Sequence, residues 1–186
     1  SREYARVVVD VGANDGFLSS NSYALVQMGW SSVLLEPNPN MMDLARKSQG
    51  IWVDPYGDGE QTACYLTAGM TGAAQSSKMT LELSDDAVTM ESSLRKGKLK
   101  ESTGKSIEVD VLSVADVVER CPALSALGKT NKRFGLLSVD AEGVGDTVLH
   151  AWLDAGWRPE FVIYEPMHNK EPSSVTTKYM EGLGYT

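Results

Sequence analysis

The stretch VVVDVGANDGF at residues 7–17 has the order of a buried strand, a tight loop and the start of a helix. Val7–Val11 is apolar except for Asp10, as in a strand that is covered on both faces. Gly12 and Gly16 bracket the loop, and glycine lets a backbone turn sharply and approach a ligand closely. Loop amides and a following helix N-terminus favour a carboxylate or a phosphate. The stretch therefore predicts a ligand-binding unit of an α/β fold.

Residues inside and beyond this loop discriminate between ligands. A dinucleotide fingerprint has three glycines, GxGxxG, but the middle position here is Asn14. The Asp10 carboxylate would repel a pyrophosphate and attract the ammonium group of an amino acid. Glu36 ends the next apolar run, 20 residues beyond Gly16, which is the spacing of an acid that binds ribose hydroxyls. An adenosyl ligand with a sulfonium and a free amino-acid end fits better than NAD, although each acid taken alone could also be a solvated strand end or a helix cap.

The same pattern continues along the chain. Apolar runs that end at or near an acid predict three more parallel strands, at Val33–Glu36, Leu136–Asp140 and Phe161–Glu165, with a weaker candidate at Ile51–Asp54. Helices are predicted between these strands, at Phe17–Met28 and from Asn38-Pro39 onward. Apolar residues at helical spacing predict three more helices, within residues 114–121, 144–153 and 175–183. This alternation predicts a mostly parallel, doubly wound sheet of the Rossmann-like α/β class.

The middle of the chain has a different pattern. Ala63–Ala68, Met79–Leu83 and Ile107–Val111 predict a small antiparallel insertion, because the last run alternates apolar and acidic residues and so has one wet face. Gly69–Lys78 and Ser92–Ser106 are predicted to be surface loops, and loops of this kind shape acceptor pockets.

The ends of the chain carry two further expectations. We expect a single domain over residues 1–186, excised from a longer chain because it starts at Ser1. The chain stops at Thr186, where a helix end is predicted to lead into another strand, so we expect the sheet to lack its last strands.

Composition excludes several classes of protein. Apolar residues make up 42% and charged residues 23% of the 186 residues, which is ordinary for a globular domain. The net charge of −8 leaves no general basic face for nucleic acid. No membrane span or signal peptide is visible, so the default location is cytoplasmic. The two cysteines, Cys64 and Cys121, are predicted to be free buried thiols, and two scattered histidines do not predict a metal site.

Four segments in order resemble the FkbM-type methyltransferases. They are Val9–Gly16, Leu35–Pro39, Ser138–Gly143 with Val148-Leu149, and Val162–Glu165. The resemblance implies a class I Rossmann-like fold and S-adenosylmethionine as methyl donor, with transfer usually to a hydroxyl oxygen. One departure is Gly145, where the family often has a further glutamate, with Asp146 beside it.

The resemblance also implies roles for individual residues. The loop Asp10, Gly12, Ala13, Asn14, Asp15, Gly16 and Phe17 would hold the methionine end of the cofactor. Glu36 with Pro37 would hold the ribose, and the turn Asp54, Pro55 and Tyr56 would border the adenine. Asp140 and Glu142 would face the transferred methyl group.

A general base would assist if the acceptor is an alcohol. Asp140, Glu142 and His168 are the candidates, and His168 has the near-neutral ordinary pKa. Glu142 could instead be a helix N-terminal acid, and His168 a solvated loop residue. The function expected is methyl transfer to a small-molecule, sugar or lipid-like acceptor. A non-catalytic adenosyl-binding module and an NAD-type oxidoreductase are the alternatives, and the sequence does not define the oligomeric state.

Overall fold

A computed structural model describes residues 4–18, 20–53, 59–84, 92–93, 102–141, 143–165 and 173–186. Its strands are β1 (Ala5–Val11), β2 (Ser31–Leu35), β3 (Ala63–Leu66), β4 (Ala68–Gly69), β5 (Ser77–Ser84), β6 (Ser92–Ser93), β7 (Ser102–Val111), β8 (Arg133–Val139) and β9 (Arg158–Tyr164). Its helices are α1 (Tyr23–Gln27), α2 (Pro39–Gly50), α3 (Val114–Arg120), α4 (Pro122–Gly128), α5 (Gly145–Asp154) and α6 (Ser173–Gly182).

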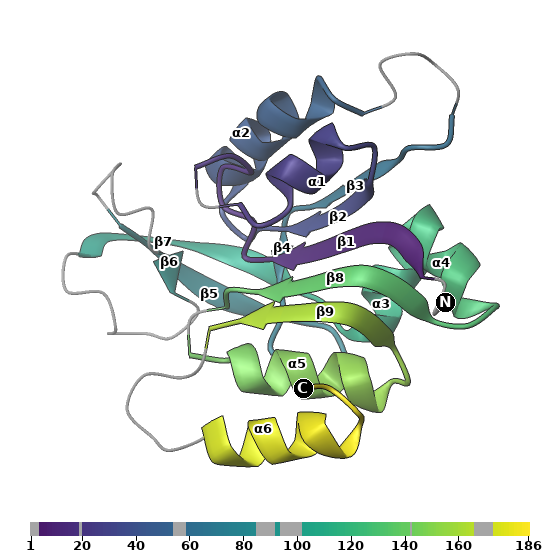
Figure 1. Ribbon diagram of the computed structural model, residues 1–186. Helices are drawn as coiled ribbons and strands as arrows, with labels where there is room; N and C mark the ends of the chain where they lie inside the picture. Colours follow the sequence, from purple (N-terminus) through teal and green to yellow (C-terminus); the bar gives the residue numbers. More distant parts are fainter. Residues whose placement is uncertain are drawn as a thin grey trace.

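The main sheet has five parallel strands in the order β3-β2-β1-β8-β9 (Figure 1). The chain builds outward from β1 to β3, and then returns to the other side of β1 to form β8 and β9. The strand order therefore reverses between β1 and β8, and ligands bind at the carboxyl ends of strands at such a point. This topology confirms the predicted Rossmann-like class and the four predicted parallel strands.

A second sheet has the strand order β4-β7-β5-β6. β5 and β7 pair antiparallel over most of their length, which confirms the predicted antiparallel insertion. The prediction for residues 63–68 was wrong, because β3 pairs with β2 in parallel as the edge of the main sheet. Only Ala68 and Gly69 belong to the second sheet, where they pair with β7.

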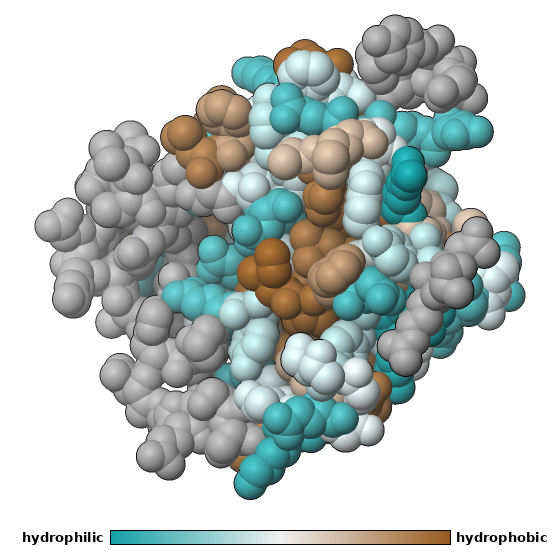
Figure 2. Space-filling model, in the orientation of Figure 1, coloured by the Kyte–Doolittle hydropathy of each residue, from teal (hydrophilic) through white to brown (hydrophobic). Residues whose placement is uncertain are grey.

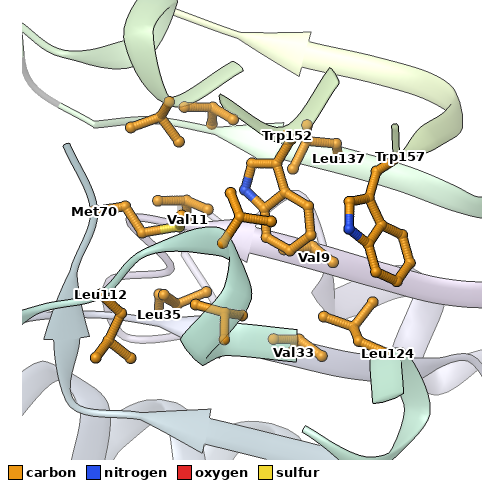
Figure 3. Close-up of a cluster of buried hydrophobic side chains, with 14 of the residues drawn as sticks. Val9, Val11, Val33, Leu35, Met70, Leu112, Leu124, Leu137, Trp152 and Trp157 are labelled. Atoms are coloured by element: carbon orange, nitrogen blue, oxygen red, sulfur yellow. The ribbon is translucent and has the colours of Figure 1, made fainter. Parts of the chain in front are cut away.

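Apolar side chains cover both faces of the main sheet at its central strands β1, β2 and β8. One face packs against α3, α4 and α5 in a large cluster, in which Val9, Val33 and Leu137 of the sheet meet Leu124 and Trp152 of the helices (Figure 3). The opposite face packs against α1 and α2 through two smaller clusters. Burial on both faces explains why these strands are nearly continuous apolar runs.

Helix α1 is much shorter than the predicted helix over Phe17–Met28. The Asp15 carboxylate accepts hydrogen bonds from the amides of Phe17 and Leu18, at 2.9 and 3.0 Å, and so holds a turn where the helix was expected. Ile51–Asp54 was also wrongly predicted as a strand, because Ile51 caps α2 and the next described residues form a turn. Likewise, Tyr185 follows α6 outside any strand and packs against β9 through its hydroxyl.

Cys64 and Cys121 form a disulfide, so the prediction of two free thiols was wrong. Cys64 lies on β3 and Cys121 lies between α3 and α4, and their Cα atoms are 5.6 Å apart. The two residues are 57 positions apart in sequence. Only the packing of α3 and α4 against the edge of the sheet brings them together.

One face of the molecule carries exposed apolar surface, seen as brown atoms near the centre of Figure 2. Phe161 and Ile163 of β9 are 57% and 47% exposed. They line a pocket of about 500 Å³ together with Tyr4, Leu25, Trp30 and Met180. Among the described residues, no helix is both long and apolar enough to cross a membrane.

Candidate functional site

The loop after β1 is held against both neighbouring strands. The amides of Gly12 and Ala13 donate to the Leu35 carbonyl of β2, at 2.9 and 3.0 Å. On the other side, the Asp140 amide donates to the Val11 carbonyl at 2.8 Å. A Cβ atom at Gly12 would lie 1.9 Å from the Asp140 carbonyl oxygen, and its φ of +83° also favours glycine. The predicted juxtaposition of loop and Asp140 is therefore observed.

Gly16 is required by packing against α2. Its φ is +68°, and a Cβ atom there would lie 2.8 Å from Cα and Cβ of Ala45. The Gly16 carbonyl accepts a hydrogen bond from the buried side-chain amide of Gln49, at 3.0 Å. Both glycines of the loop thus allow the protein's own backbone to approach closely, whereas the sequence suggested close approach of a ligand.

Glu36 lies beside the loop at the end of β2 and is 7% exposed. Its two carboxylate oxygens accept hydrogen bonds from the backbone amides of Asn14, at 3.0 Å, and Asn38, at 2.7 Å. The pKa of Glu36 is raised from 4.5 to about 7, chiefly by burial; the two amides oppose this shift, and the charges of Asp10 and Asp140 contribute to it. Glu36 therefore connects the loop to the start of α2.

Asp10 is 2% exposed and lies behind the loop. Its carboxylate accepts hydrogen bonds from the hydroxyls of Ser22, at 2.7 Å, and Ser20, at 3.3 Å. Burial raises the pKa of Asp10, whereas hydrogen bonds from Ser22, Ser138 and Ser20 act in the opposite direction. The carboxylate thus accepts hydrogen bonds from protein hydroxyls, and its charge acts on Glu36 from nearby.

Asn14 occupies the most unusual backbone conformation in the loop. Its φ is +51°, a region that few residues other than glycine adopt and in which asparagine is enriched. Its side-chain oxygen is buried and has no hydrogen-bond partner in the described part of the chain. A buried acceptor without a donor is costly, so this atom indicates a place for a ligand donor.

The structure brings most of the predicted site residues together. Residues 10 and 12–17, Glu36 with Pro37, and Asp140 all lie at the carboxyl ends of β1, β2 and β8. Asp15 holds the turn at Phe17, whose side chain is 52% exposed. Asp54, Pro55, Tyr56, Glu142 and His168 lie outside the described residues. No group of three metal-ligating side chains is found in the described ranges.

The side chains that act electrostatically on Glu36 are acidic. They are Asp10 behind the loop and Asp140 at the end of β8. Such a cluster disfavours a pyrophosphate and favours a ligand with positive charge.

The family model for the methyltransferase FkbM domain matches residues 10–186, nearly the whole chain. The chain belongs to the FkbM methyltransferase family. No curated protein and no solved structure matches it. The match begins at Asp10, so it includes the loop, Glu36 and Asp140 described above.

This FkbM domain departs from the expected pattern at Gly145 for a physical reason. A Cβ atom at Gly145 would lie 2.8 Å from the Glu165 carbonyl oxygen, so glycine lets the start of α5 approach the end of β9. The neighbouring Asp146 accepts a hydrogen bond from Thr176 at 3.0 Å and thereby binds α6. Asp146 is therefore engaged in packing between α5 and α6.

Sequence reasoning missed the network that supports the loop of the FkbM domain. Gln49 of α2 is fully buried, and besides Gly16 its amide donates to the hydroxyls of Ser22, at 2.9 Å, and Ser20, at 3.3 Å. These two hydroxyls bind Asp10. No local pattern identifies such residues, because a glutamine within an amphipathic helix is usually exposed.

Proposed function

We propose that this domain transfers a methyl group from S-adenosylmethionine to a hydroxyl oxygen of a small-molecule, sugar or lipid-like acceptor. The observation that carries the donor assignment is Glu36, a buried carboxylate at the end of β2 that faces the loop following β1. Each carboxylate oxygen has more than one acceptor site, so both can bind a ribose hydroxyl while they keep their amide donors. FkbM family membership supports the methyl-transfer chemistry.

The residues present fit this donor. Asp10, Glu36 and Asp140 supply negative charge near the loop, which suits the sulfonium and the ammonium group. The buried side-chain oxygen of Asn14 can accept a hydrogen bond from the ammonium group. These features favour S-adenosylmethionine over NAD, whose pyrophosphate is anionic.

When bound, S-adenosylmethionine supplies a methyl group that is activated on a sulfonium. The protein has to align the acceptor oxygen with that methyl group in a near-attack geometry. Asp140 is exposed at the carboxyl end of β8, next to Gly12, and is well placed to orient the acceptor or take its proton. Glu142 and His168 remain our further candidates for the base, and Asp54, Pro55 and Tyr56 for the adenine border.

Calorimetry with S-adenosylhomocysteine tests the donor assignment. We expect binding to the wild-type domain and a loss of about tenfold or more for Glu36→Ala, since hydrogen bonds to a charged group each contribute about 1.5–3 kcal/mol. Glu108→Ala is the matched control, because it removes an exposed carboxylate of β7. Thermal stabilisation by NAD(H) and not by S-adenosylhomocysteine would reject the assignment.

The acceptor requires a separate experiment. The wild-type domain is incubated with S-adenosylmethionine and panels of alcohols, sugars and lipid-like hydroxyl compounds, each beside its amine analogue. Products are identified by mass and by the position of the new methyl group. Methylation on oxygen is expected. Products methylated only on nitrogen would reject the hydroxyl assignment and leave the donor assignment intact.

A further inference from the structure

The Cys64–Cys121 disulfide connects the edge of the main sheet to the junction of α3 and α4. Cys64 belongs to β3, the edge strand of the main sheet, and Cys121 is fully buried between α3 and α4. The chain between the two cysteines contains β4, β5, β6 and β7, and then α3. The bond therefore joins the two ends of the segment that carries the second sheet, one end at β3 of the main sheet and the other between α3 and α4.

A short path of contacts connects this bond to Glu36. β3 pairs with β2 so that Cys64 lies opposite Val33 and Leu66 lies opposite Leu35. The Leu66 carbonyl, two residues after Cys64, accepts a hydrogen bond from the Glu36 amide at 3.1 Å. The backbone position of Glu36 thus depends on where β3 lies.

Besides the disulfide, β3 is held by its pairing with β2 and by the packing of Cys64 and Leu66 against the large buried cluster. It is also held by β4, which follows it almost directly and pairs with β7. β3 has four residues, each of them partly exposed, and it pairs with β2 at the edge of the sheet. On its outer side, Arg46 of α2 donates to the Tyr65 carbonyl at 3.1 Å and stacks over the Tyr65 ring. The disulfide is the covalent restraint, and it connects β3 to the helices on the other face. Short edge strands open locally, so such a restraint changes their position and protection.

We propose that the Cys64–Cys121 disulfide is a positioning element of the cofactor site, because it holds β3 so that Leu66 fixes Glu36. This inference rests on the proposed function. Formation of the bond removes two electrons and two protons from the two thiols, and an acceptor disulfide is reduced to a dithiol. Disulfides persist in oxidising compartments, so the domain is expected to act in one, contrary to the cytoplasmic default.

The test compares the oxidised protein with the same protein in dithiothreitol and with the double variant Cys64→Ala/Cys121→Ala. All samples contain sulfate, which strengthens apolar burial and so favours the folded state, and circular dichroism measures whether each form is folded. Calorimetry measures the Kd for S-adenosylhomocysteine. Hydrogen exchange gives the exchange rate of the Glu36 amide, which is divided by the exchange rate of the Val9 amide in the central strand β1 to give an exchange ratio. Both reduced forms are expected to raise the Kd about fivefold or more and to raise the exchange ratio of Glu36 to Val9 by a similar factor.

Leu124→Ala is the matched control for a general loss of stability. Leu124 is fully buried on α4 in the cluster that contains Cys121, but its substitution leaves the disulfide in place. We expect a lower Tm, a Kd within about twofold of wild type and an unchanged exchange ratio.

Three results would overturn the inference. The first is free thiols in protein prepared under oxidising conditions, and the second is an unchanged Kd and exchange ratio on reduction. The third is reduced protein that stays unfolded in sulfate, because the bond would then stabilise the whole fold. The exchange ratio separates this inference from the proposed function. If the ratio rises on reduction but the oxidised protein does not bind S-adenosylhomocysteine, the donor assignment fails while the coupling of the bond to Glu36 stands. If the oxidised protein binds and reduction changes neither value, only the positioning role fails.

Discussion

Replacing Glu36 with glutamine should remove a pH dependence from the stability of the ligand-free domain. The folded-state pKa of Glu36 is about 7, above its ordinary value of 4.5, chiefly because of burial. The folded protein therefore binds this proton more tightly than the unfolded chain does. The resulting stabilisation is fully present below about pH 4.5 and is lost as the pH rises through about 7.

The magnitude follows from the two pKa values. Between about pH 5 and about pH 8, the free energy of unfolding of the wild-type domain should fall by about 2.5 kcal/mol through this group. Glu36→Gln keeps the shape of the side chain but cannot ionise, so this part of the slope should vanish. The slope due to the buried Asp10 is present in both proteins and largely cancels in the comparison.

Urea unfolding, followed by circular dichroism at several pH values, gives the free energies needed. Glu108→Gln is the control for the loss of one carboxylate, because Glu108 is exposed on β7, where it pairs with Lys78. Slopes for wild type and Glu36→Gln that agree within about 0.5 kcal/mol over this range would refute the reasoning, since Glu36 would then be ionised in the folded domain at both pH values.

Three further outcomes are expected. As the pH is raised toward about 7, the affinity for S-adenosylhomocysteine measured by calorimetry should rise about tenfold per pH unit, and above about pH 7 it should level off. The reason is that ribose hydroxyls bind the ionised form of Glu36, and an affinity that does not change with pH would contradict this. Gly12→Ala should lower the free energy of unfolding by about 3 kcal/mol in urea, because φ is +83° and a Cβ would meet the Asp140 carbonyl; a loss below about 1 kcal/mol would contradict the geometry. Cys64→Ala/Cys121→Ala should lower the free energy of unfolding by about 4 kcal/mol through loop-closure entropy over the 57-residue separation, and equal urea midpoints would contradict this stabilisation.

The central strands of the main sheet could be predicted because burial on both faces leaves a local signature. Val7–Val11 and Leu136–Asp140 are nearly continuous apolar runs, and β1 and β8 occupy those positions. The meeting of the loop, Glu36 and Asp140 also followed from sequence, since an open α/β sheet gathers its strand ends at the point where the strand order reverses. The start of α2 was predicted correctly, because Asn38 accepts a hydrogen bond from the Asn40 amide.

The features that could not be predicted depend on contacts between distant residues. Each residue of β3 is partly exposed, so its short run carried no signal for parallel pairing at an edge. The helix expected from Phe17 is replaced by a turn because Asp15 binds the amides of the turn, and Asp10 binds the serines beyond it. Gln49 and the disulfide partners likewise meet only in the folded chain.

The Cys64–Cys121 disulfide also bears on which positions of this domain can change. The segment from Cys64 to Cys121 is fixed at both ends, to β3 of the main sheet and to the junction of α3 and α4. Substitutions within this segment fall into two kinds, because Met70, Leu112 and Val117 belong to the large buried cluster while Lys78 and Glu108 are exposed on the second sheet. Exposed positions of the second sheet can therefore change at little cost, whereas its buried positions are restrained by packing against the main sheet.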